Sequence, residues 1–181
     1  MVRDANHKIS RDIVRRYPQS MIGFEDLTGI RERTERSGGS KKQRKVNRER
    51  SQWPFAEIYS LMAYKALLNG GVAPKVFADY TSQHCIECTF TSKKNRPNKG
   101  LVFKCKDCGY ELNADLVGSR NVGIRTIVAW QDWVATGVLS MLPDVSDAEA
   151  KTECLRRYSE LRWSHAQITS LGLQPGWIDL N

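Results

Sequence analysis

Two pairs of cysteines constrain this chain more than any other feature of its sequence. The pairs are Cys85-Ile-Glu-Cys88 and Cys105-Lys-Asp-Cys108, and sixteen residues separate them. A CxxC turn lets two sulfur atoms reach one metal ion while backbone N–H groups point back at them, and two such turns complete a tetrahedron with Zn–S distances of about 2.3 Å. The spacing therefore predicts a zinc ribbon over residues 83–110 that binds one zinc ion per chain.

Two other interpretations of the cysteines remain open, namely redox chemistry and four ordinary reduced thiols. A thioredoxin-type site contains a single CxxC motif, whereas this chain has two. Because four protein ligands leave no position for a bound water, the predicted zinc is structural rather than catalytic. The fifth cysteine, Cys154, has no CxxC partner and is expected to be an ordinary residue of the C-terminal tail.

The charge balance points to a polyanionic partner. The chain has 28 Lys and Arg residues against 20 Asp and Glu, a formal net charge of +8. An excess of this size makes nucleic acid the first partner to consider, with a merely basic soluble protein as the alternative. There is no run of 18 apolar residues and no apolar N-terminal segment of a signal peptide, so we expect a cytoplasmic protein without a membrane partner and with reduced cysteines.

Hydrophobic periodicity predicts a mixture of helices and strands. The first helix covers residues 5–17, with an apolar stripe made of Ile9, Ile13, Val14 and Tyr17. A buried strand over 21–27 follows and ends in Glu25 and Asp26. The later expected elements are a largely buried helix over 55–68, a strand over 72–80, a helix over 114–134 and helical spacing near 147–162. The helix over 114–134 is expected to direct inward Leu116, Val117, Ile124, Ile127, Val128 and Trp130.

Residues 31–50 form a strongly basic segment, with nine Lys or Arg against three Glu. Such a segment is a mobile loop or a helix that becomes ordered on a partner, and a solvated linker is the alternative. Cations can displace condensed counterions from phosphates, so the segment is a candidate for nucleic-acid binding. Its candidate contacts are Arg31, Arg33, Lys41, Lys42, Arg44 and Lys45.

Two acidic residues occupy the ends of predicted elements. Glu25 lies at the end of a strand, and Asp115 opens a helix in the motif Asn113-Ala114-Asp115. Each has an ordinary explanation when taken alone: an acid at a helix N-terminus interacts favourably with the helix dipole, and a strand end is commonly solvated. Their order along the chain, combined with the other motifs, is more specific than either acid alone.

The combined motifs resemble the C-terminal part of the TnpB proteins of insertion sequences, also called the OrfB transposase family, which are related to type V CRISPR effectors. The resemblance covers about residues 4–128. The segments that carry it are His7-Lys8-Ile9-Ser10, Phe24-Glu25-Asp26-Leu27-Thr28-Gly29-Ile30, Thr81-Ser82-Gln83-His84-Cys85, Phe103-Lys104-Cys105, Asn113-Ala114-Asp115 and Arg120-Asn121.

This resemblance implies an α/β fold, a partial RNase H-like domain of the RuvC type with an inserted four-cysteine zinc ribbon. The nuclease domain would comprise residues 1–82 and 111–136, the ribbon 83–110 and a C-terminal tail 137–181. The implied function is RNA-guided DNA cleavage in transposition and DNA recombination, with DNA and a guide RNA as partners. By residue match, Glu25 and Asp115 would be catalytic and would hold magnesium, which suits hard carboxylate oxygens.

The sequence departs from the family pattern in two places. Thr89 follows the first cysteine pair, where the family usually has glycine. The first catalytic aspartate of the family lies on an early strand, but only 24 residues precede Glu25. We therefore expect an incomplete enzyme whose missing strands come from another chain. The alternatives are a non-cleaving zinc-ribbon module or regulator that binds nucleic acid, and the product of a gene remnant that barely folds. If the nuclease layout is correct, the carboxylates of Glu25 and Asp115 should lie within about 8 Å.

Overall fold

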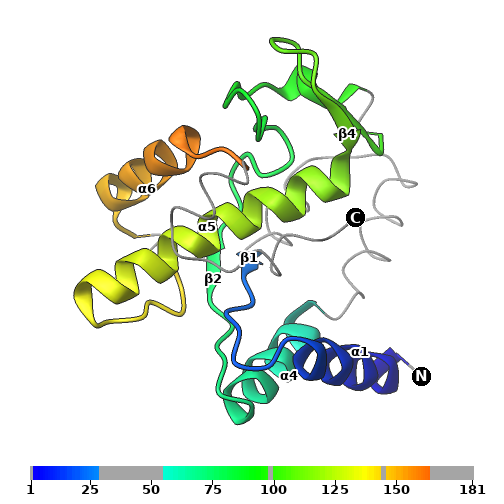
Figure 1. The fold of residues 1–181 in the computed structure, drawn as a ribbon, viewed down its shortest axis with the longest axis vertical. Coiled ribbons are helices and arrows are strands. Elements are labelled where there is room, and N and C mark those ends of the chain that lie inside the picture. The colour runs from blue at the N-terminus through cyan, green and yellow to red at the C-terminus, as the bar shows by residue number, and fades with distance from the viewer. Residues whose placement is uncertain (1, 29–54, 98–99, 144–145, 164–181) are drawn as a thin grey trace. The chain divides into compact units, whose positions relative to one another are not determined.

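The computed structural model describes residues 2–28, 55–97, 100–143 and 146–163. These residues form two compact units, 1–75 and 76–181. Helices and short strands occur in both units (Figure 1), which agrees with the mixed α/β class. The RNase H-like layout and the expected domain boundaries remain predictions. Within the described residues, no helix combines the length and apolar character needed to cross a bilayer.

The first unit is built on two packed helices, α1 (Val2–Arg16) and α4 (Phe55–Leu68). Their shared core contains Val14, Met62, Ala66 and Ala73. The strand β1 (Phe24–Asp26) runs beside the segment that leads into β2 (Lys75–Phe77), since Ile22 and Phe24 donate backbone hydrogen bonds to Val72 and Pro74. The isolated bridge between Met21 and Val72 is parallel, as a crossover connection through a helix requires.

Burial in this unit does not follow the apolar pattern of the sequence. In α1, Ile9 and Tyr17 are 47% and 41% exposed, and the buried face instead includes Asn6 and Ser10. Polar residues can be buried there because Ser10 Oγ donates to the Asn6 carbonyl oxygen at 2.7 Å and accepts from Lys65 Nζ at 2.6 Å. The helix α4 is not largely buried, because Phe55, Tyr64, Leu67 and Leu68 are exposed in the part of the chain that the structure describes.

The second unit is organised around one long helix, α5 (Ala114–Thr136). A hairpin of β3 (Val102–Lys104) and β4 (Glu111–Asn113) leads directly into this helix, with Phe103 paired to Leu112 in antiparallel register. Ahead of the hairpin lies the 3₁₀ turn η1 (Lys93–Asn95). The helix α6 (Ala148–Glu160) lies beside the C-terminal half of α5 (Figure 1).

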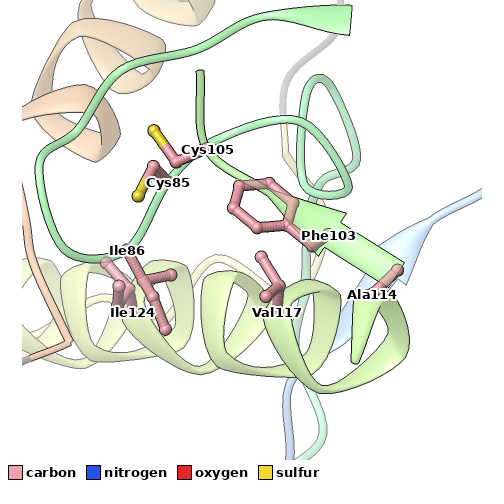
Figure 2. Close-up of a cluster of buried hydrophobic side chains, with 7 residues drawn as sticks. All are labelled: Cys85, Ile86, Phe103, Cys105, Ala114, Val117 and Ile124. Atoms are coloured by element: carbon pink, nitrogen blue, oxygen red, sulfur yellow. The ribbon is translucent and has the colours of Figure 1, made fainter. Parts of the chain in front are cut away.

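Two clusters of buried side chains hold this unit together. The first joins the cysteine loops and the hairpin to α5 (Figure 2), and its members are Cys85, Ile86, Phe103, Cys105, Ala114, Val117 and Ile124. The second joins α6 to α5 through Phe77, Val128 and Tyr158. Leu116, which we expected to point inward, is 40% exposed. The register of α5 instead buries the polar residues Asn121 and Arg125.

Candidate metal centre and the expected acidic residues

The four cysteines of the two CxxC motifs come together in the second unit. All four sulfur atoms lie within 4.8 Å of one another. The Sγ–Sγ distance is 3.8 Å between Cys85 and Cys108 and 3.5 Å between Cys88 and Cys105. Four sulfurs bound to one tetrahedral zinc ion at about 2.3 Å would be about 3.8 Å apart. The donor set and its spacing therefore fit a single zinc ion.

The two cysteine loops share two backbone features. Cys85 N donates to the Phe90 carbonyl oxygen at 3.0 Å, and Cys105 N donates to that of Tyr110 at 2.8 Å. In each loop the residue after the second cysteine lies in the left-handed region, with φ of 69° at Thr89 and 77° at Gly109. The two loops can therefore present their sulfurs to one ion in equivalent ways.

Backbone N–H groups also point at the first sulfur of each loop. Burial raises the pKa of the Cys85 thiol, although the amides of Glu87 and Cys88 favour its thiolate. Burial acts in the same direction on Cys105, but hydrogen bonds from the Cys108 and Asp107 amides, together with the neighbouring thiols, outweigh it and lower the pKa. Amide donors of this kind stabilise the deprotonated sulfur that a metal ion requires.

Two buried asparagines hold the cysteine loops in place. Asn95 has no exposed surface, and its Nδ2 donates to the carbonyl oxygens of Gln83 and Phe90 at 2.9 and 3.1 Å. Its Oδ1 accepts from the backbone N–H of Lys106 at 3.0 Å, so one side chain bridges both loops. Sequence reasoning missed Asn95, because nothing in the local pattern distinguishes it from a polar loop residue.

The second asparagine, Asn121, belongs to the Arg120-Asn121 motif and fixes the first loop to α5. Its Nδ2 donates to the carbonyl oxygens of Thr81 and His84 at 2.8 and 3.0 Å. One turn later, the buried Arg125 donates to the carbonyl oxygens of Phe77 and Asp79. Both residues thus supply donors to the chain that leads from β2 into the first cysteine loop.

Glu25 lies in β1, where it is half-buried next to Asp26. Asp26 accepts hydrogen bonds from Thr28, and Lys75 Nζ lies 3.5 Å from its carboxylate. Burial would raise the pKa of Asp26, but these hydrogen bonds and the charge of Lys75 outweigh it and lower the pKa below the ordinary value of 3.8. Lys75 also lies 4.6 Å from the centroid of the Tyr59 ring. The Asp26 carboxylate is therefore already used in contacts within the first unit.

Asp115 is the second residue of α5 and is exposed. Asn113 caps this helix, and its Oδ1 accepts from the backbone N–H groups of Asp115 and Leu116 at 2.8 and 3.3 Å. The helix start thus lies where the sequence predicted it. Since Glu25 and Asp115 belong to different units, the expectation that their carboxylates lie within about 8 Å of each other stays a prediction. The six basic candidates, Arg31, Arg33, Lys41, Lys42, Arg44 and Lys45, lie outside the described residues.

Comparison with known proteins gives a consistent result. Residues 55–122 match the family model described as "Cas12f1-like, TNB domain". A CRISPR-associated endodeoxyribonuclease Cas12f1 of Sulfoacidibacillus thermotolerans is 36% identical over 125 residues, 67% of this chain and 26% of the relative. InsQ of Escherichia coli K12, named as a candidate RNA-guided DNA endonuclease, is 34% identical over 128 residues, 66% of this chain and 31% of the relative.

A third relative is a TnpB-like protein of Aquifex aeolicus, which is 31% identical over 121 residues, 63% of this chain and 38% of the relative. The chain thus spans between about a quarter and two fifths of the length of these three relatives. The segment that matches the family model contains all four cysteines of the CxxC motifs, Asn113 and Asn121. Together these similarities show that part of this chain is a segment of the TnpB family.

Proposed function

We propose that this chain is part of an RNA-guided DNA endonuclease of the TnpB type, in which Cys85, Cys88, Cys105 and Cys108 bind one structural zinc ion. The observation that carries the proposal is the grouping of the four sulfur atoms within 4.8 Å, inside the segment that matches the family model. Four protein ligands leave no open position on zinc, so its role is to stabilise the fold of the ribbon.

Metal analysis of the purified full chain tests the zinc site. We expect one zinc per chain, and we expect Cys105→Ser to lose most of it because three ligands no longer close the tetrahedron. The chain offers a matched control in Cys154, a half-buried cysteine of α6 outside the group. Cys154→Ser should retain the zinc, and a Cys105→Ser protein with unchanged zinc content would refute the site.

For catalysis, we propose that Glu25 and Asp115 hold divalent cations at the DNA phosphate. Bound magnesium supplies activation of a water molecule and stabilisation of the leaving oxygen. Two features of the chain support these roles. The Asn113 cap fixes the backbone that carries Asp115. Of the two neighbouring acids in β1, Asp26 already contacts Lys75 and Thr28, so Glu25 is the better candidate for a metal ligand.

Because this chain spans only about a quarter to two fifths of the length of its relatives, magnesium-dependent cleavage of guided target DNA is measured with the chain supplemented by a fragment that covers the rest of a relative. We expect cleavage by this complex. Glu25→Gln and Asp115→Asn should then abolish it, whereas Asp107→Asn, which neutralises an exposed acid between the second pair of cysteines, should not. Cleavage that survives both substitutions would remove the two acids from the site.

A second candidate function is binding of nucleic acid without cleavage. Exposed cations on the ribbon, at Lys93, Lys94 and Lys106, favour it because they can contact phosphates without any acidic site. The basic segment 31–50 would add to this binding. The cleavage assay with the supplemented chain distinguishes the two functions. DNA binding that persists while no cleavage product forms would favour the binding module.

A further inference from the structure

A short segment after α6, which we call the strap (Leu161–Trp163), lies against the first cysteine loop. The backbone N–H of Trp163 donates to the carbonyl oxygen of Ile86 at 2.9 Å. Ile86 lies between Cys85 and Cys88 and has no exposed surface. Leu161 and Trp163 both pack against the buried cluster that contains Cys85 and Cys105. The strap therefore holds the middle of a loop whose two ends carry candidate metal ligands.

The Trp163 ring occupies a position that only a glycine on α5 leaves open. A Cβ atom at Gly123 would lie 2.9 Å from Cζ3 of the ring, closer than normal packing allows. The Arg120 guanidinium lies 5.8 Å from the ring centroid, and its Nη1 donates to the Tyr110 hydroxyl at 3.3 Å. Because the Tyr110 carbonyl also accepts from Cys105 N, the strap is connected to the second cysteine loop as well.

The strap is itself anchored by α6. Arg157 donates two hydrogen bonds to the Asp132 carboxylate at 3.0 and 2.8 Å, and Lys151 forms an ion pair with Asp79 at 3.1 Å. Tyr158 is buried, with the Arg125 guanidinium 4.8 Å from its ring centroid. These contacts hold α6 in place, so the strap that follows it lies next to the cysteine loops.

We propose that the strap is a positioning element for the metal centre, so that retention of zinc depends on the docking of Trp163. This inference rests on the proposed zinc site. The hydrogen bond to the Ile86 carbonyl oxygen and the packing of Trp163 oppose opening of the loop, which slows release of Cys85 and Cys88 from the ion. By thermodynamic linkage the dependence is reciprocal, and bound zinc favours the docked strap.

Zinc release from the full chain to the chromogenic chelator 4-(2-pyridylazo)resorcinol tests this. Trp163→Ala should accelerate release by about 3- to 10-fold, somewhat less than the roughly 10- to 100-fold effect of removing a direct partner of a metal ligand. Trp133→Ala, at a partly exposed position on α5, should leave the rate unchanged. Trp163→Phe should restore most of the retention, since a smaller aromatic ring can occupy the same position.

A pair of glycine substitutions separates positioning from general stability. Gly123→Ala should accelerate release because its methyl group displaces the ring, even though alanine favours a helix more than glycine does. Gly118→Ala makes the same change on the same helix where no described atom lies within 4 Å of the new Cβ, and it should not accelerate release.

The outcomes are distinct. A wild-type chain without stoichiometric zinc would refute the proposed metal site itself. A chain that binds one zinc ion but releases it at the same rate in Trp163→Ala and Gly123→Ala would overturn the role of the strap alone. If Gly118→Ala and Gly123→Ala accelerate zinc release equally, the faster release comes from a change in α5 itself. That result would also overturn the role of the strap.

Discussion

The left-handed backbone at Thr89 leads to a quantitative prediction. Thr89 has φ of 69°, and the equivalent residue of the second loop is Gly109, with φ of 77°. This conformation costs an L-residue about 1–2 kcal/mol, and a β-branched side chain makes it less favourable. Glycine adopts it without strain but loses about 0.5–1 kcal/mol more conformational entropy on folding. The balance predicts that Thr89→Gly raises the free energy of unfolding by about 0.5–1 kcal/mol.

The reverse substitution, Gly109→Thr, is the matched control. A Cβ at residue 109 would have no described atom within 4 Å, so the Cβ itself meets no steric clash. The left-handed backbone costs threonine more than glycine, and we expect the free energy of unfolding to fall by about 0.5–1 kcal/mol. The double variant should return close to the wild-type stability, because the two positions act through separate loops.

Thermal unfolding at one fixed free zinc concentration measures both variants, since bound metal contributes to the apparent stability. For a unit of about a hundred residues, a change of 1 kcal/mol shifts the Tm by about 4–8 °C. Thr89→Gly should therefore melt at higher temperature and Gly109→Thr at lower temperature. A Thr89→Gly protein that is less stable than the wild type would show that the threonine side chain makes contacts worth more than the strain.

Three further predictions concern other parts of the chain. The pKa of Asp26 is lower in the folded state than its ordinary value of 3.8. Its charged form therefore stabilises the first unit at pH values above 3.8, and this stabilisation is lost as the pH falls through the folded-state pKa. Asp26→Asn should thus be less stable at neutral pH, with a difference that shrinks in acid during pH-dependent denaturation; a difference independent of pH would contradict the linkage. Asn121→Leu leaves two buried carbonyl oxygens without a donor and should cost about 1–3 kcal/mol in chemical denaturation, whereas an unchanged midpoint would refute the anchoring role. Neutralising four cations of the basic segment should weaken DNA binding and reduce its dependence on salt, and no change in either would make the segment a linker. The four are Lys41, Lys42, Arg44 and Lys45.

Local sequence signals predicted much of the secondary structure. The helices expected over 5–17 and 114–134 appear as Val2–Arg16 and Ala114–Thr136. The start of the longer helix was predictable because Asn113 can cap it through its own side chain, and its end is marked by Gly137 in the left-handed conformation. Such signals act within one turn of a helix, so they can be interpreted without knowing the fold.

The packing of polar residues could not be predicted in this way. Asn121 and Arg125 satisfy carbonyl oxygens about forty or more residues earlier in the chain, and Lys65 reaches Ser10 across the first unit. A sequence pattern assigns such residues to the surface because it contains no information about distant partners. The same limitation explains the exposed apolar positions, since Leu67 and Leu68 remain 70% and 78% exposed in a helix that is apolar on most sides.

The sequence by itself determined the candidate ligand set, because two sulfurs three residues apart can reach one ion through local backbone geometry alone. It also indicated the family through the order of its motifs. Only the tertiary structure decided that Asn121 fixes the first cysteine loop to α5, and that Trp163 after α6 binds the Ile86 carbonyl oxygen. The physical reason is the distance along the sequence between the residues that interact. A CxxC turn is fixed by neighbouring residues. Docking of the strap depends on side chains that come together only when α6 folds back beside α5.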